Sequence, residues 1–412
     1  MPDLLRNFLP DSLENGSQRA GFLVLAGSIA LVLVSIAASQ ILLAIAIPMA
    51  IWLGLPKKKV AWRRSPALFP LAGFFVWTVL AALASSNPWL ALGILKKFFL
   101  FIILFLVPCL FGGKDRILWV YRAIFAVAFV AASKGVFQYL ANPNRDLLHR
   151  ISGFMSQWMT YSGLLMLVLV ALSAYIMCIG LGRSAWVLPL GFLLIVALAL
   201  SLTRNSWLGA IAGLAVILAL VRPRALGGLL MIILVLLLIS PGKVRYRLRS
   251  GMDLSDDNTK NRIELFSTSM RLIRDNPWFG VGPKNVAQEA LHYRGTYEYP
   301  DWLYQHMHNN FLQLAAERGL PGLALWLWLI FSLIRAAWRV HRASIPRAGP
   351  GPGRPEPSEA LFASTAALGC CAALLVAGFF EYNFGDSEVL TLFLFIMSAP
   401  WAFSEDLAGK PA

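Results

Sequence analysis

Residues 187–221 decide the fold: they read VLPLGFLLIVALALSLTRNSWLGAIAGLAVILALV, two apolar runs joined by a short turn. Each run approaches the roughly 20 apolar residues that a helix needs to cross a bilayer core of about 30 Å. The turn is too short to reach far into water, yet it holds one arginine, Arg204. This stretch predicts two membrane helices connected at one membrane surface.

The composition extends this prediction to the whole chain. Of its 412 residues, 58% are apolar and only 14% are charged, against about 25% charged in a typical soluble domain. Such a chain cannot cover itself with polar surface in water, so most of it must face lipid. With 26 Phe, 14 Trp and 10 Tyr, it is also too aromatic to be disordered.

Splitting the apolar runs at charges and at Pro/Gly positions predicts an all-α polytopic membrane protein with about 12 transmembrane helices. The first run is expected to be an anchor, because it leads directly into a second span instead of a signal-peptide cleavage site. The predicted spans are 21–38, 41–55, 67–84, 95–112, 117–138, 160–181, 185–202, 205–221, 225–240, 318–337, 360–380 and 388–404.

Lys and Arg in the short connections predict the orientation, because these residues collect on the cytoplasmic side. The basic clusters at 57–64 and 335–354 fall on one side if both termini are cytoplasmic. The Pro/Gly-rich stretch 344–358 is then a cytoplasmic linker. We therefore predict spans 1–9 within residues 1–240, a large helical periplasmic loop with catalytic elements at 241–317, and spans 10–12 within 318–412.

The net charge of +15 indicates contact with anionic membrane lipids, and no nucleic-acid-binding signature accompanies it. Ten of the basic residues fall within 241–309, on the predicted outer side. Lipid headgroups or a phosphate-bearing substrate would each account for them. The four cysteines lie within apolar runs and predict neither a disulfide framework nor a zinc site.

Two segments of this loop have helical spacing. In 259–275, Ile263, Phe266, Met270 and Ile273 form one apolar stripe. The turn NPWFGVGPKN (276–285) follows and offers Lys284 to an anion; it does not follow a strand, so a dinucleotide-binding interpretation is excluded.

The second segment is predicted to be helical from His308 to Arg318. His306 and His308 would diverge on a regular helix and could not chelate one metal together, so no metal site is expected. A neutral His308 at a helix start could act as a general base; a surface histidine is the alternative.

Arg204 has little polar loop to place it in water and no local acidic partner. It either extends to the lipid headgroups or binds a buried anion. Other predicted outer connections supply Arg150, the pair Lys96 and Lys97, and the acidic stretch EYNFGDSE at 381–388. The polar residues on the predicted outer side are therefore expected to lie close together, at one site at the end of the helix bundle.

Taken together, the apolar spans, the TRNSW turn, and a long loop carrying NPWFGVGPKN and HMHNNFLQLAAERGLPG (306–322) resemble the O-antigen ligase and O-antigen polymerase superfamily of bacterial inner membranes. The resemblance covers about 150–330, and EYNFGDSE is also similar. It is closest to O-antigen ligase.

This resemblance implies transfer of a glycan from undecaprenyl diphosphate, on the periplasmic side, to lipid A–core in lipopolysaccharide biosynthesis, with no cofactor or metal. Arg204 matches the family arginine between two spans, Arg262 the arginine that opens the loop helix, and His308 the histidine before Asn. The first two would bind the diphosphate and His308 would be the catalytic base. Arg150, Lys284 and His306 are secondary candidates.

Three alternatives stay open. A polymerase would use a second lipid-linked repeat unit as acceptor, and a protein O-glycosyltransferase would use a protein. A permease for an anion such as bicarbonate belongs to a different class and predicts charges at mid-span or an inverted repeat with broken helices.

Overall fold

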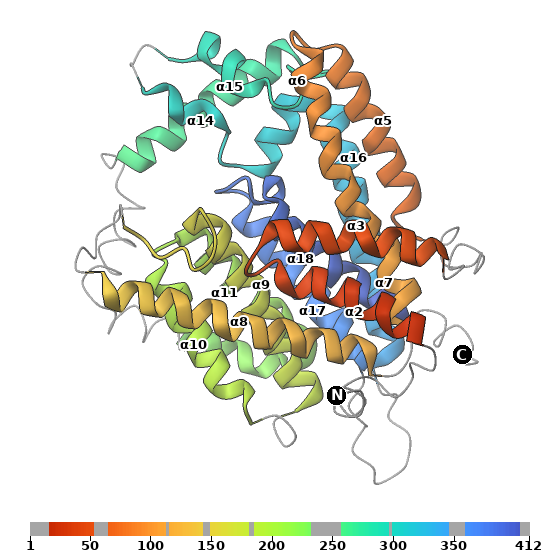
Figure 1. The fold of residues 1–412 in the computed structure, drawn as a ribbon. Helices are drawn as coiled ribbons and strands as arrows, with labels where there is room; N and C mark the ends of the chain where they lie inside the picture. Colours follow the sequence, from red (N-terminus) through yellow and green to blue (C-terminus); the bar gives the residue numbers. More distant parts are fainter. Residues whose placement is uncertain are drawn as a thin grey trace.

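The computed structural model describes residues 16–52, 65–112, 115–142, 149–180, 185–231, 257–295, 299–345 and 359–403, and every regular element in these ranges is a helix (Figure 1). The α-helices are α2 (Gly16–Leu31), α3 (Ile36–Trp52), α5 (Leu68–Leu83), α6 (Pro88–Leu92), α7 (Ile103–Phe111), α8 (Arg116–Ala141), α9 (Trp158–Ile179), α10 (Val187–Leu200), α11 (Arg204–Val221), α14 (Asp257–Asp275), α15 (Val286–Glu289), α16 (Asn310–Ser344), α17 (Glu359–Ala377) and α18 (Ser387–Ser398). Six 3₁₀ segments join them: η2 (Gly93–Ile102), η3 (Pro223–Ala225), η4 (Ala290–Tyr293), η5 (Asp301–Gln305), η6 (Asn383–Gly385) and η7 (Ala399–Phe403).

The helices confirm the prediction of an all-α polytopic membrane protein. In the described part of the chain, six helical stretches are long and apolar enough to cross a membrane: α6–η2–α7, α8, α9, α11, α16 and α17. Four shorter apolar stretches join them, namely α3, α5, α10 and α18 with η7. The predicted linker and most of the ninth predicted span lie outside the described residues.

Helix α17 lies at the centre of the bundle and packs on α9, α11 and α16. Glycines allow the closest approach: a Cβ on Gly213 of α11 would lie only 2.8 Å from the carbonyl oxygen of Gly369 on α17. Small residues at helix–helix contacts are how membrane helices gain packing without a hydrophobic driving force. Because α17 packs closely on its neighbours, the position of the segment that follows its end at Ala377 is well defined.

The polar residues 257–309, which we call the cap, lie at one end of the molecule, where α14 and α15 sit beside the end of α6 (Figure 1). The cap has an apolar core of its own, including Leu265, Leu272, Val286 and Tyr304. Helix α16 runs from the cap into the bundle (Figure 1) and contacts both α14 and α17. It therefore ties the cap to the membrane helices.

A break in α16 provides the attachment. Gly319 has φ 68° and ψ 179°, and backbone groups on either side of it bond to the turn at 277–282. The amide of Leu320 donates to the Pro277 carbonyl at 2.8 Å, and the amide of Gly282 donates to the Glu317 carbonyl at 3.0 Å. A Cβ on Gly319 would lie 2.0 Å from the Trp278 oxygen, so only glycine fits. The predicted stop at Gly319 is confirmed as a kink, after which the helix continues.

Helix α14 confirms the predicted helical segment, but only one member of its apolar stripe faces the cap core. Ile273 is 8% exposed and belongs to that core, whereas Ile263, Phe266 and Met270 are about half exposed, at 54%, 56% and 48%. The buried face also carries Leu265 and Leu272, together with Thr268 and Ser269. The hydroxyls of Thr268 and Ser269 bond to Glu264 and to the Leu265 carbonyl, so their burial leaves no hydroxyl without a partner.

Candidate functional site

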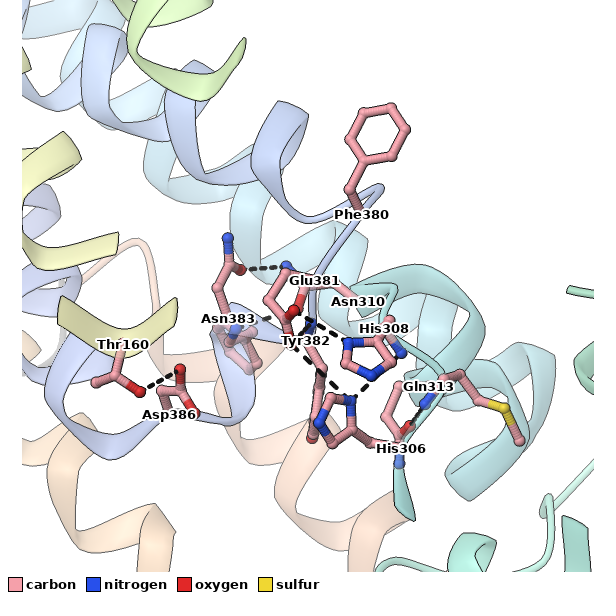
Figure 2. Close-up of polar contacts among 12 residues, drawn as sticks. Thr160, His306, His308, Asn310, Gln313, Phe380, Glu381, Tyr382, Asn383 and Asp386 are labelled. Atoms are coloured by element: carbon pink, nitrogen blue, oxygen red, sulfur yellow. Dashed lines mark hydrogen bonds and ion pairs between the residues drawn. The ribbon is translucent and has the colours of Figure 1, made fainter. Parts of the chain in front are cut away.

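A buried carboxylate, Glu381, lies at the centre of the candidate site. It follows the end of α17, is 6% exposed, and accepts a bond from the Tyr382 amide at 3.1 Å. Its Oε2 lies 3.0 Å from His308 Nδ1 and its Oε1 lies 3.9 Å from His306 Nδ1. Figure 2 shows the two imidazoles side by side, both turned toward this carboxylate.

The protonation states follow from burial and from these contacts. Burial raises the pKa of Glu381, but the hydrogen bond from His308, the charges of both histidines and the Tyr382 amide outweigh it, so the pKa lies below its ordinary value. Burial, together with the neighbouring His308, lowers the pKa of His306 to about 4. At neutral pH the site therefore holds a carboxylate beside a neutral His306.

The two histidines converge because the chain here is not helical. His306 is extended, with φ −158° and ψ 159°, and His308 has a positive φ of 45°. Their ring centroids lie 4.0 Å apart. The expectation that they would diverge was wrong, because it assumed a regular helix, whereas α16 begins only at Asn310.

Two asparagines hold this arrangement in place. Asn309 caps α16 by accepting from the amides of Phe311 and Leu312, and its side chain donates to the Phe379 carbonyl. Asn310 is fully buried and donates to Asn383 Oδ1 at 2.7 Å. The HNN sequence thus holds the segment that carries Glu381 against His308 (Figure 2).

Arg262 reaches the same segment from α14. Its guanidinium lies 5.4 Å from the centroid of the Phe380 ring, and Nη2 lies 3.4 Å from the Phe380 carbonyl oxygen. Burial lowers the pKa of Arg262, the positive charge of Arg204 lowers it further, and Glu381 opposes both. Arg262 is therefore within electrostatic reach of both Arg204 and Glu381.

Arg204 is the first residue of α11 and is partly buried. The N-terminus of a helix attracts anions through its unpaired amides and its dipole. Two arginines of like charge, one of them at such a terminus, form a strongly anion-attracting place. Arg204 thus acts electrostatically on Arg262, and Arg262 and His308 contact neighbouring residues, Phe380 and Glu381.

The other two secondary candidates take different places. The Arg150 guanidinium stacks over the Trp158 ring, 4.4 Å from its centroid. Lys284 lies beside η2: a Cβ on Gly93 would be 3.0 Å from its Nζ. Neither is among the residues that contact Glu381 or His308 in the described part of the chain.

The sequence analysis included Glu381 and Asp386 among the polar residues of the outer side but assigned them no role. Asp386 lies at the start of α18, accepts from the Thr160 hydroxyl at 3.1 Å, and is partly buried. Burial and the charge of Glu381 raise its pKa to about 7. The signal that could have found Glu381 is an acidic residue directly after a transmembrane span, where a carboxylate is costly unless it has partners.

The site also contains a set of metal-ligand atoms. One donor atom each from His306, His308 and Glu381 lies within 4.8 Å of the others. Two imidazoles and one carboxylate are ligand types typical of zinc. The expectation that these histidines could not share a metal therefore loses its geometric basis.

Comparison with known families agrees with this geometry. Residues 189–327 match the O-antigen ligase family. The matched segment contains Arg204, Arg262, His306 and His308, while Glu381 lies beyond it. No curated protein matches the chain.

The O-antigen ligase match confirms the resemblance to the O-antigen ligase and polymerase superfamily. That family implies glycosyl-transfer chemistry on lipid-linked glycans in general. The glycine-rich turn at 280–282 and the Glu317–Gly322 stretch, on which the resemblance also rested, are the two sides of the joint between cap and α16. These two motifs therefore build the scaffold that joins the cap to α16.

Proposed function

We propose that this protein is an O-antigen ligase of the bacterial inner membrane. It transfers a polysaccharide from undecaprenyl diphosphate to a hydroxyl of lipid A–core on the periplasmic side. The observation that carries the proposal is the short segment Phe380–Glu381, which Arg262 contacts through Phe380 and His308 contacts through Glu381. The arginine proposed to bind phosphate and the histidine proposed as the base thus contact the same short segment.

The arginines stabilise the leaving group. As the bond between the anomeric carbon and the diphosphate oxygen breaks, negative charge grows on that oxygen, and guanidinium groups grip phosphate oxygens in pairs. Arg204 and Arg262 repel each other across the site, and a bound diphosphate removes that repulsion. Their interaction is therefore strongest when the charge has developed, which is what accelerates the chemical step.

His308 activates the acceptor. Its Nδ1 faces Glu381, so an Nδ1–H donated to the carboxylate leaves Nε2 as the acceptor of a proton. The acceptor hydroxyl gives its proton to Nε2 while its oxygen forms a bond to the anomeric carbon. The electron pair of the broken bond leaves with the diphosphate. A direct attack of this kind inverts the anomeric centre.

The orientation proposal has both termini cytoplasmic and the cap periplasmic. The lipid tail of the donor then lies among the apolar helices while the glycan projects past the cap. Arg204 at the start of α11 and Arg262 on α14 would meet the diphosphate between these two parts.

The test is a transfer assay with the purified full chain, a lipid-linked glycan donor and lipid A–core. Arg204→Ala and Arg262→Ala should each lower the rate by about 10²–10³. Arg274→Ala removes an exposed arginine from the same helix as Arg262 and should leave the rate unchanged. Full activity in both site variants would overturn the phosphate role.

Two further measurements define the reaction. Transfer should persist in EDTA, since the leaving-group charge is assigned to arginines. In Gram-negative strains lacking the ligase, the protein should restore a lipopolysaccharide ladder; longer chains only in a polymerase-null strain would make it a polymerase instead.

A further inference from the structure

The His306–His308–Glu381 cluster has the dimensions of a metal site even though the proposed transfer does not use one. In a tetrahedral zinc site with Zn–N and Zn–O bonds of about 2.0–2.1 Å, neighbouring ligand atoms lie roughly 3.3 Å apart. The nitrogen–oxygen distances to Glu381 are 3.0 Å from His308 and 3.9 Å from His306. Small side-chain rotations would bring all three atoms onto one ion (Figure 2).

The cluster also has the ligand types and the access that a zinc ion requires. Zinc binds imidazole nitrogen and carboxylate oxygen, which His306, His308 and Glu381 supply. Glu381 is 8% exposed at its side chain, whereas His306 and His308 are 35% and 25% exposed. The ion can therefore enter from solvent and retain a water as its fourth ligand.

We propose that His306, His308 and Glu381 bind one Zn²⁺ ion and that this ion inhibits glycan transfer. The inhibitory half rests on the proposed function of His308 as the base. A metal on Nδ1 of His308 takes the place of the Nδ1 proton, and the neutral imidazole then carries its proton on Nε2. That nitrogen can no longer accept a proton from the acceptor hydroxyl. Zn²⁺ therefore exchanges one tautomer for the other: the proton displaced from Nδ1 is taken up at Nε2, so the imidazole keeps one proton.

The chemistry of the donors selects the ion. Mg²⁺ and Ca²⁺ prefer oxygen ligands in larger number, so two imidazoles and one carboxylate disfavour them. Zn²⁺, and Co²⁺ as its spectroscopic substitute, fit a three-ligand site with an open position. Inhibition is therefore expected from Zn²⁺ and not from Mg²⁺.

Binding is tested on the purified full chain after treatment with EDTA and removal of the chelator. Zinc titration followed by elemental analysis should give one Zn²⁺ per chain, and Co²⁺ should give the visible absorption of a four-coordinate site. His306→Gln should weaken Zn²⁺ binding at least about tenfold, since ligand-supporting changes alone typically cost 10–100-fold. His292→Gln is the matched control, because His292 is 78% exposed and pairs with Glu289 instead.

Glu381→Gln is the second variant, and it guards against a folding defect in the first; it should also weaken Zn²⁺ binding. Stoichiometric binding that both variants retain, or no binding by the wild type, would overturn the site. If Zn²⁺ binds but does not slow transfer, the inhibitory half is wrong. If Zn²⁺ binds as predicted while no variant or wild type transfers glycan, the proposed function fails and the metal site stands.

Discussion

Two buried carboxylates on either side of the cap joint show how similar charges can have different uses. Glu317 and Glu381 are 3% and 6% exposed. Glu317 pairs with Arg318, the next residue, and also accepts from Gln313 Nε2 at 3.0 Å and from the Lys284 amide at 3.3 Å. Glu381 instead pairs with two histidines that are partly open to solvent.

The difference lies in what the partners can do. Arg318 donates onward to the Thr78 hydroxyl and its carbonyl accepts from Trp77, so the Glu317–Arg318 pair is enclosed by fixed partners. Arginine does not lose its proton in proteins. Histidine does, and it faces open space here. A saturated buried pair stabilises the joint, whereas an open pair with a titratable partner can perform chemistry.

The largest expected effect is on catalysis at the open pair. His308→Ala removes the proposed base and should lower transfer by roughly 10²–10⁴. The thermal unfolding midpoint should fall by less than in a variant that breaks the Glu317–Arg318 pair, because His306 and the Tyr382 amide still contact Glu381. Transfer assays and thermal unfolding of the same preparations check both. A folded His308→Ala variant with wild-type turnover would contradict a catalytic use of the pair that His308 forms with Glu381.

At the closed pair the effect should fall on folding. Arg318→Ala leaves Glu317 as a buried charge without its counter-ion, which typically costs 3–5 kcal/mol. The variant should show reduced yield and a lower unfolding midpoint, while the fraction that folds still transfers glycan. Loss of transfer by a well-folded Arg318→Ala protein would place this pair in the catalytic machinery.

The amino-acid sequence predicted the membrane helices well, because an apolar run of bilayer length has few other uses. Arg204 and His308 stood out from their surroundings and Arg262 from the family resemblance, and the roles of all three stay predictions. The sequence could not predict that His306 faces the same carboxylate as His308. That convergence depends on a positive φ at His308 and on Asn310 bonding to a residue 73 positions away.

The buried face of α14 shows the same limit. Spacing identified Ile263, Phe266, Met270 and Ile273 as the apolar stripe, but of these only Ile273 lies in the cap core, with Leu265 and Leu272. Thr268 and Ser269 are buried on the same helix, because each hydroxyl has a partner. Sequence periodicity indicates an apolar stripe, but it does not show which residues of the helix the cap covers.

A smaller effect is expected when charge alone is removed from each carboxylate. Glu381→Gln can still contact His308, but the neutral amide no longer holds the Nδ1 proton firmly, so part of the general-base contribution is lost, about 10- to 10²-fold. Glu317→Gln should lower the unfolding midpoint and leave transfer per folded molecule unchanged. We expect the transfer rate to fall mainly in Glu381→Gln and the unfolding midpoint to fall mainly in Glu317→Gln. If both variants lose both quantities to the same extent, the two carboxylates act as one unit.

The smallest effect concerns Asp386, which is partly buried and whose carboxylate accepts from the Thr160 hydroxyl. Its pKa is raised from 3.8 to about 7 by burial and by the charge of Glu381. A raised carboxyl pKa favours the protonated form in the folded state, so this contribution to stability is complete below about pH 4. It declines as the pH rises toward 7 and stays lost above that.

Asp386→Asn is neutral throughout and can still accept from Thr160. Its unfolding midpoint relative to wild type should therefore increase between pH 5 and pH 8, by roughly 2–4 °C if about 1 kcal/mol is recovered. A difference that is constant across this range would show that Asp386 is already ionised in the folded protein. The site would then hold two ionised carboxylates, Asp386 and Glu381.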